Sequence, residues 1–137
     1  MQSYLTKVGA LISLVVLSAC SITPHVTGTV LTKKEDAMLA RRVPATVFTP
    51  ADSVVCYVYF QWDEVTKDAG RHELTWRWYQ DDKLVSQGGR SLHFRRTPYT
   101  TWTQRSAGSL GIGSFSVATV LDGTEVSRTN FEIRPSL

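Results

Sequence analysis

The sequence predicts an all-β protein, an antiparallel β-sandwich, on three observations. Apolar and polar residues alternate with a period of two along several segments, most clearly over residues 71–80, and residues 53–62 form a strongly apolar segment. Turn-forming residues interrupt these segments about every 8–12 positions, as expected for short antiparallel strands. After residue 20 no long stretch shows the 3.6-residue period of an amphipathic helix. Such a chain buries its apolar faces by packing one sheet on another.

The two segments with the clearest pattern are expected to form the centre of the fold. Residues 53–62 are apolar on both faces, which is typical of a strand covered at least in part on both sides. In residues 71–80, Leu74, Trp76 and Trp78 share one face, and the other face is more polar. These side chains predict a core centred on tryptophan.

Weaker signals complete a set of about seven strands. Asp81-Asp82 and Asp122-Gly123 predict hairpin turns. Gly88-Gly89 and Thr97-Pro98 predict breaks, and residues 105–113 predict a glycine-rich loop. Besides the short segment 84–85 that completes the first hairpin, the remaining expected strands cover residues 44–48, 91–96, 99–104, 114–121 and 125–134. This number and spacing of strands favour a sandwich of the immunoglobulin-like type over a barrel.

The first 19 residues have the composition of a secretory leader. A short segment with Lys7 and no acidic residue precedes an apolar run over residues 8–17. In a helix this run would span about 15 Å, half of the ~30 Å hydrocarbon core of a bilayer. The run is therefore too short for a comfortable membrane-spanning helix.

The apolar run ends in Leu17-Ser18-Ala19-Cys20, which resembles the lipobox of bacterial lipoproteins. The resemblance implies cleavage before Cys20, diacylglycerol on its sulfur and usually an acyl chain on the freed amine. Several acyl chains hold a protein on a bilayer stably, whereas one does so only marginally. In this family Asp after the cysteine tends to retain the protein in the inner membrane, so Ser21 implies an outer-membrane protein facing the periplasm. The alternative is an ordinary leader, or an N-terminal anchor, with a chance cysteine.

Three parts follow from cleavage at this point. They are a signal peptide over residues 1–19, a lipidated N-terminus with a flexible tether over 20–42, and a β-sandwich domain over 43–137. The tether is expected because its first half is rich in turn-forming and hydroxyl residues and its second half carries paired charges. Its basic residues either form a solvated face or reach anionic head groups. They are Lys33, Lys34, Arg41 and Arg42.

A second pattern lies within residues 46–134. Trp78-Tyr79 is followed by Gly113-x-Phe115-x-Val117, the Asp122-Gly123 turn and a closing Phe131-x-Ile133. This succession resembles small immunoglobulin-like domains of uncharacterised bacterial envelope proteins. The resemblance implies a fold and no particular activity. The chain departs from the pattern by having Asp82 where a glycine is common in the first turn.

Composition excludes several classes of function. A formal charge of +3 over 137 residues is too small for nucleic-acid binding. With Cys20 lipidated, Cys56 has no disulfide partner, and its apolar strand predicts a buried, unreactive thiol. His25, His72 and His93 lack the spacing of metal ligands and are interpreted as surface or edge residues.

No catalytic motif is present in the sequence, so we expect neither an enzyme nor a cofactor. An enzyme would need His72 or His93 beside a serine or a carboxylate in a cleft. The sequence offers no sign of such a set, although the residues of a catalytic triad can be scattered along a chain.

The candidate binding residues are aromatic or basic. They are Tyr57, Tyr59, Tyr79, Arg95, Arg96, Trp102 and Arg105. The three tyrosines would form one outward strip, and the arginines would lie around the tryptophan. The first hypothesis is contact with an envelope protein, in an accessory or scaffold role. The alternative is an envelope glycan (polysaccharide, peptidoglycan or lipopolysaccharide) whose phosphates the arginines hold. A solvated strand edge without a binding role remains the third interpretation.

Overall fold

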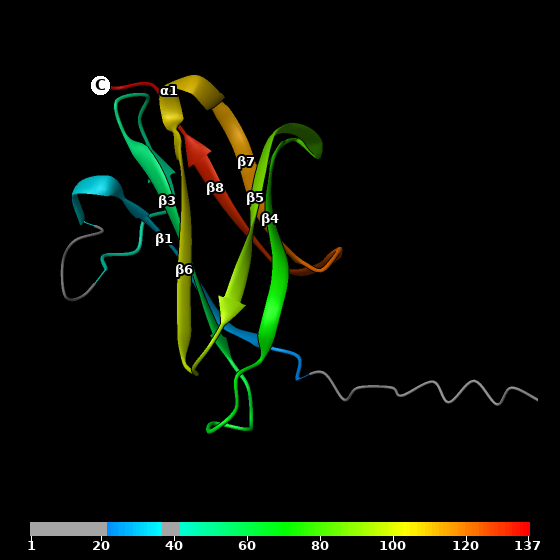
Figure 1. Ribbon diagram of the computed structural model, residues 1–137. Coiled ribbons are helices and arrows are strands. Elements are labelled where there is room, and N and C mark those ends of the chain that lie inside the picture. The colour runs from blue at the N-terminus through cyan, green and yellow to red at the C-terminus, as the bar shows by residue number, and fades with distance from the viewer. Residues whose placement is uncertain (1–21, 37–41) are drawn as a thin grey trace, which may run out of the picture.

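The structure is a computed structural model that describes residues 22–36 and 42–137 (Figure 1). The elements along these residues are β1 (His25–Lys33), the 3-10 turn η1 (Lys34–Asp36), β2 (Val47–Phe48), β3 (Ser53–Gln61), β4 (Gly70–Gln80), β5 (Lys83–Phe94), β6 (Tyr99–Ser106), α1 (Ala107–Leu110), β7 (Gly113–Leu121) and β8 (Thr124–Ile133). The expected signal peptide and Cys20 lie outside the described residues. Within the described part of the chain, no helix has the length and apolarity needed to cross a membrane.

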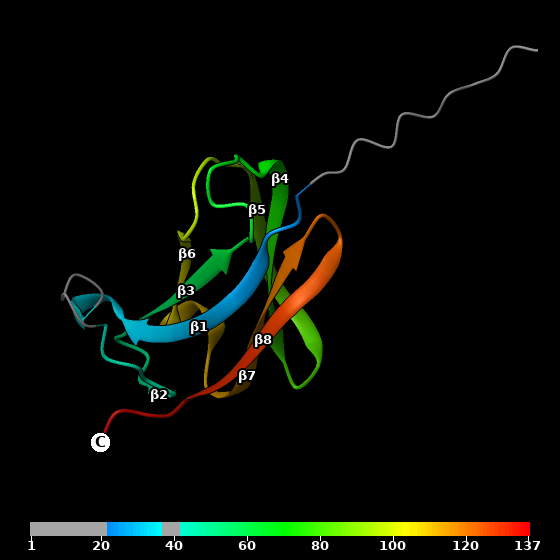
Figure 2. The ribbon, with the colours of Figure 1, turned by 90° about the horizontal axis from the view of Figure 1, so that it is seen from below.

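The strands form two sheets that pack face to face (Figures 1 and 2). One sheet has three strands in the order β1-β3-β6, and the other has five in the order β2-β8-β7-β4-β5. All neighbours are antiparallel except the short β2, which runs parallel to β8. The predicted all-β sandwich is confirmed, with eight strands in the described residues where the sequence predicts about seven.

The core lies between one row of side chains from each sheet. The rows are Val54, Cys56, Val58 and Phe60 from β3, and Leu74, Trp76 and Trp78 from β4, all at most 1% exposed. Aromatic rings meet edge to face here, as between Trp78 and Phe131, whose ring centres are 5.9 Å apart. The predicted core centred on tryptophan is confirmed.

Cys56 behaves as the sequence predicts. Its side chain is fully buried in the β3 row, and burial raises the pKa of the thiol to about 12. Because the thiolate is the reactive form, this cysteine is unreactive at neutral pH.

Both predicted hairpin turns form, and they place aspartates at positive φ. Asp81 and Asp82 join β4 to β5 with φ of 46° and 65°, and Asp122 precedes Gly123 with φ of 49°. Two consecutive positive φ values are those of a type I′ turn, whose twist matches that of the flanking strands. Aspartate tolerates this region better than most residues, which explains how the first turn forms without a glycine.

The expected break at Gly88-Gly89 is wrong, because both glycines lie inside β5. Gly88 pairs with Trp76 and Gly89 pairs with Thr75 of β4. A Cβ atom on Gly89 would lie 2.6 Å from the carbonyl oxygen of Leu74. Gly89 therefore permits a close approach of β5 to β4, and the glycine pair does not form a turn.

We predict that Gly89→Ala destabilises the domain by about 1–3 kcal/mol, the usual cost of overpacking. The matched control is Gly88→Ala, whose new Cβ would meet the end of the flexible Arg105 side chain at 2.9 Å and should cost less. Urea unfolding of both variants measures the difference. Equal costs would contradict this explanation of the glycine pair.

The expected glycine-rich loop over residues 105–113 is only partly present. Strand β6 continues to Ser106, and α1 adds one helical turn before β7. The turn is held by a hydrogen bond from the Ala107 N–H to the Asp52 carbonyl oxygen at 2.9 Å. It ends at Gly111, whose φ of 95° suits glycine.

The expected flexible tether is wrong for residues 25–33, which form β1. This strand pairs with β3 from His25 opposite Gln61 to Lys33 opposite Val54. Pro24 and Gly28 suggest a flexible segment, but the β-branched residues that follow Pro24 favour a strand, and these residues determine the structure.

The sandwich consequently begins earlier than residue 43. Leu31 and Thr32 of β1 are buried, and Ile22 and Val26 pack against the core. The basic residue Lys33 is not part of a free solvated face, since its amine lies 3.6 Å from the Asp52 carboxylate.

Candidate functional site

The outer face of the three-stranded sheet carries the main group of aromatic candidates. Trp102 of β6 lies directly opposite Tyr57 of β3, so the two side chains share a face. Tyr59 is two residues further along β3 and shares it too. On the other side of β3, Val30 of β1 lies opposite Tyr57. We call Tyr57, Tyr59 and Trp102 the aromatic face.

Arg42 lies on the aromatic face, although it is not among the predicted binding residues. Its guanidinium carbon is 3.8 Å from the centre of the Tyr57 ring, and Nη1 donates a hydrogen bond to the Tyr59 hydroxyl at 2.8 Å. Partial burial alone would lower the pKa of Arg42, but hydrogen bonds to the two tyrosines outweigh it and raise the pKa above its usual value. The arginine is thus a fixed cation held between two rings. Its distance in sequence from both tyrosines leaves no local pattern by which it could have been found.

Exposure changes across the aromatic face. Tyr57 is 8% exposed beneath Arg42, whereas Trp102 is 46% exposed on the edge strand β6. Trp102 is therefore the part of the aromatic face that is most accessible to another molecule.

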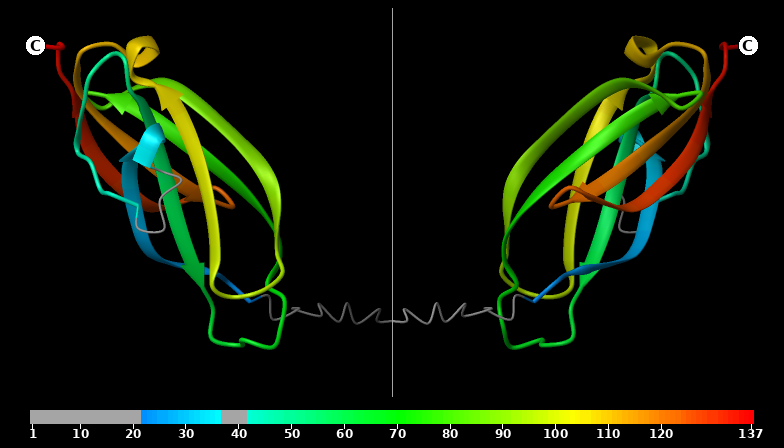
Figure 3. Two further views of the ribbon diagram at one scale, coloured as in Figure 1. Left: turned by 90° about the vertical axis from the view of Figure 1, so that its left-hand side faces the viewer. Right: turned by 90° about the vertical axis from the view of Figure 1, so that its right-hand side faces the viewer.

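Two arginines close the side of the sandwich where β5 and β6 run past each other in different sheets (Figure 3). Arg105 donates from Nε to the Ser86 hydroxyl at 2.9 Å and from Nη1 to the Gln104 carbonyl at 2.8 Å. Arg90 donates to the Trp102 carbonyl. Their guanidinium carbons lie 5.6 Å and 5.3 Å from the rings of Trp78 and Trp76. Arg105, a predicted binding residue, is therefore engaged in joining the sheets.

The other predicted candidates lie apart from the aromatic face. Arg95 and Arg96 are exposed in the loop between β5 and β6. Tyr79 lies on the five-stranded sheet, with the Arg128 guanidinium 4.4 Å from its ring centre. The expected strip of three outward tyrosines is wrong, because Tyr79 belongs to the opposite sheet.

His72 differs from its expected surface position. It is only 9% exposed, with Nδ1 at 2.5 Å from an Asp122 carboxylate oxygen and Nε2 donating to the Ala69 carbonyl at 2.8 Å. His93, on the edge strand β5 as expected, lies 2.6 Å from the Asp68 carboxylate. Each histidine thus has the neighbouring carboxylate that an enzyme would need, but both ring nitrogens of His72 are occupied.

Asp122 makes the stability of the domain depend on pH. Partial burial alone would raise its pKa, but hydrogen bonds from His72 and from the Glu73 N–H outweigh it and lower the pKa. A lowered pKa stabilises the fold above the unfolded value of about 3.9, and this contribution is lost as the pH falls through the folded pKa.

We predict that Asp122→Asn, which also tolerates positive φ, lowers stability at neutral pH by about 1 kcal/mol or less, because the carboxylate is half exposed. The difference in the free energy of unfolding between the variant and the parent protein should disappear below about pH 4. Urea unfolding across pH measures it, and a constant gap would contradict the assignment.

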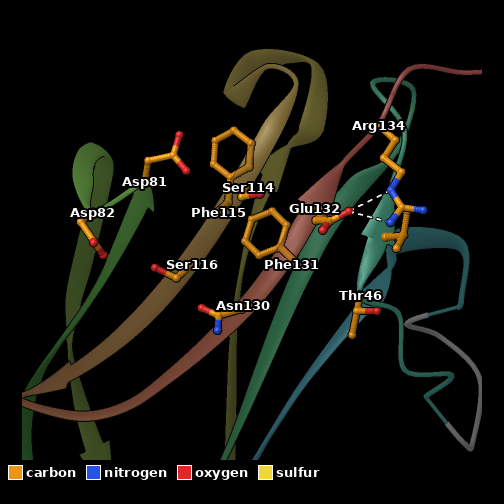
Figure 4. Close-up of a pocket in the computed structure, with 11 residues that line it drawn as sticks. Thr46, Asp81, Asp82, Ser114, Phe115, Ser116, Asn130, Phe131, Glu132 and Arg134 are labelled. Carbon is orange, nitrogen blue, oxygen red and sulfur yellow. Dashed lines mark hydrogen bonds and ion pairs between the residues drawn. The ribbon is translucent and has the colours of Figure 1, made fainter.

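A shallow groove of about 570 Å³ lies on the outer face of the five-stranded sheet (Figure 4). Ser116 and Asn130 form its floor, the Asp81-Asp82 turn lies on one side and Thr46 on the other. Glu132 in this groove is paired with Arg134 at 2.8 Å. No sequence feature pointed to this groove, whose polar residues lie on different strands.

Metal binding has no visible basis in residues 22–36 and 42–137. No group of three or more His, Cys, Asp or Glu side chains there is arranged to hold an ion.

Comparisons with known proteins bear on the fold. No model of a protein family matches the chain, and no curated protein is similar in sequence. An immunoglobulin-like protein (PA1606) from Pseudomonas aeruginosa superposes with a TM-score of 0.56, covering 85% of this chain and 100% of that one. The fold is immunoglobulin-like. The two sequences are 7% identical, so the likeness concerns the fold alone.

A second solved structure has a lower similarity. It is the CARDB domain of the PF1109 protein from Pyrococcus furiosus, solved in complex with di-metal ions. The match covers 87% of this chain and 100% of the CARDB chain. It superposes with a TM-score of 0.47 at 9% identity.

Proposed function

We propose that this chain is a lipid-anchored protein of the bacterial envelope whose immunoglobulin-like domain is not catalytic and binds another envelope protein through the aromatic face. The observation that carries the proposal is the half-exposed Trp102 opposite Tyr57, together with the fixed cation of Arg42 over the Tyr57 ring. Tryptophan, tyrosine and arginine are the residues that contribute most to the energy of protein interfaces. The lipobox resemblance at Cys20 supplies the anchor.

The histidines support a role without catalysis. Asp122 and the Ala69 carbonyl occupy both nitrogens of His72, so its ring is not free to move a proton to or from a substrate. His93 and Asp68 are paired at the surface and neither lines the groove.

A glycan ligand is the second candidate, because the exposed indole of Trp102 would stack on a sugar ring. The arginines favour it less. Arg105 is engaged between the sheets. Arg95 and Arg96 lie in the loop that precedes β6, and this strand begins at Tyr99, three residues before Trp102. The phosphate-binding cluster that this function needs is therefore not assembled.

Photo-crosslinking in the native host cell tests the choice. A benzophenone amino acid at Trp102 should give one dominant protein adduct, and the adduct should disappear when Arg42→Ala is added. The same probe at the exposed Asn130, on the other sheet, is the matched control. An adduct containing carbohydrate would favour the glycan, and protein adducts only from position 130 would contradict the aromatic face.

A further inference from the structure

The structure leaves almost no chain between Cys20 and the folded domain. Ile22 already packs against the core, and Pro24 is buried. Two residues of fully extended chain span at most about 7 Å. A lipid on Cys20 would therefore hold the domain at the bilayer surface rather than at the end of a spacer.

The pairing of β1 shows which end of the sandwich would face the bilayer. β1 begins at His25, which lies opposite Gln61 at the end of β3. The loop over residues 62–69 follows Gln61, and the loop over 95–98 lies at the same end, because Tyr99 pairs with Phe60. In Figure 1 these loops are at the bottom, and α1 and the C-terminus are at the top.

The side chains at this end suit a lipid surface. Val65 is 69% exposed at the loop over residues 62–69, and Arg95 and Arg96 are exposed in the neighbouring loop. Arginine binds phosphate through two parallel hydrogen bonds, and an apolar side chain gains free energy by entering the region between head groups and acyl chains.

Acidic residues at this end are largely engaged within the domain. Glu64 is bound by Lys67 at 2.7 Å and Asp68 by His93 at 2.6 Å, while Asp63 is exposed. Net charge does not bring this end to the bilayer. The short chain to a lipid on Cys20 would do so, and it would bring the arginines to the phosphates.

We propose that the loops over residues 62–69 and 95–98 form a membrane-contact surface, in which Arg95 and Arg96 bind phospholipid phosphates and Val65 enters the interfacial region. This inference rests on the proposed anchor at Cys20.

The aromatic face would then lie close to the bilayer. Trp102 is about 10 Å along β6 from Tyr99, at the strand rise of about 3.3 Å per residue. The partner of the aromatic face would then be a protein that reaches the membrane surface.

Depth-dependent fluorescence tests the surface. The protein purified from membranes is placed in vesicles of phosphatidylethanolamine and phosphatidylglycerol, with a polarity-sensitive dye on Val65→Cys or, as control, on the exposed Ser109→Cys in α1 at the far end. Cys56 stays unlabelled because its thiol is buried with a pKa of about 12. Nitroxide-labelled head groups should quench the dye at 65 severalfold more than at 109, and Arg95→Ala with Arg96→Ala should reduce that quenching.

The outcomes separate the two proposals. Equal quenching at both positions on protein whose intact mass includes acyl chains would overturn the membrane-contact surface and leave the anchor standing. Protein without acyl chains would overturn both. Quenching at 65 that is unchanged by the double arginine variant would overturn the role of Arg95 and Arg96.

Discussion

Trp78→Ala should lower the free energy of unfolding by about 3–5 kcal/mol, the usual cost of truncating a buried tryptophan. Trp78 is fully buried, meets Phe131 edge to face and lies beneath the Arg105 guanidinium. Its indole N–H has no hydrogen-bond partner, which offsets part of this loss because the variant removes an unsatisfied donor. Since small domains are stable by only about 5–15 kcal/mol, the variant should be close to unfolding.

Trp102→Ala is the matched control for this prediction. The same substitution at a side chain that is 46% exposed should cost about 1 kcal/mol or less. Urea unfolding followed by far-ultraviolet circular dichroism compares the two variants. Similar losses at both positions would contradict the assignment of Trp78 to the core and of Trp102 to an exposed face.

The same Trp102→Ala variant should have its large effect on binding. Removing a central aromatic residue from a protein interface typically costs about 2 kcal/mol or more, which is roughly a 30-fold loss of affinity. Arg42→Ala should weaken binding to a similar degree, because it removes the cation that fixes Tyr57 and Tyr59. Once crosslinking has identified the partner protein, its affinity for each variant is measured by calorimetry with the purified, uncrosslinked partner.

Tyr79→Ala provides the control for binding, because it removes a tyrosine that also lies beside an arginine but on the opposite sheet. Its affinity should stay within a factor of about two of the parent, as for residues outside an interface. A loss at Tyr79 as large as that at Trp102 would contradict the aromatic face as the contact surface.

Two patterns identify strands from the sequence alone. In one, the two faces of the strand differ in polarity, and in the other, both faces are apolar. The period of two in β4 placed Trp76 and Trp78 in the core, and the two apolar faces of β3 placed that strand at the centre of its sheet. Local turn chemistry located both hairpins. These features depend on neighbours in sequence, so a single sequence contains them.

The misplaced elements depend on contacts between distant residues. β1 is an edge strand with few fully buried positions, so its alternation is weak. Gly88 and Gly89 follow the residue preference of a turn, and only their position against β4 explains them as part of a strand.

The candidate site could be predicted only in part for the same reason. The period of two predicts which tyrosines share a face within one strand, but it does not say which sheet a strand joins, so the prediction wrongly groups Tyr79 with Tyr57 and Tyr59. Arg42 reaches the aromatic face from a segment before β2, and Arg105 turns toward β5. Such placements are set by the packing of whole strands.

A lipid on Cys20 is the proposed anchor of this immunoglobulin-like domain. Its most direct test is the intact mass of the protein extracted from membranes, beside a Cys20→Ala variant. If Cys20 is lipidated, the mature protein should consist of residues 20–137 with the added mass of acyl chains, and the variant should remain uncleaved. An unacylated chain cleaved at another position, with the variant processed in the same way, would contradict it.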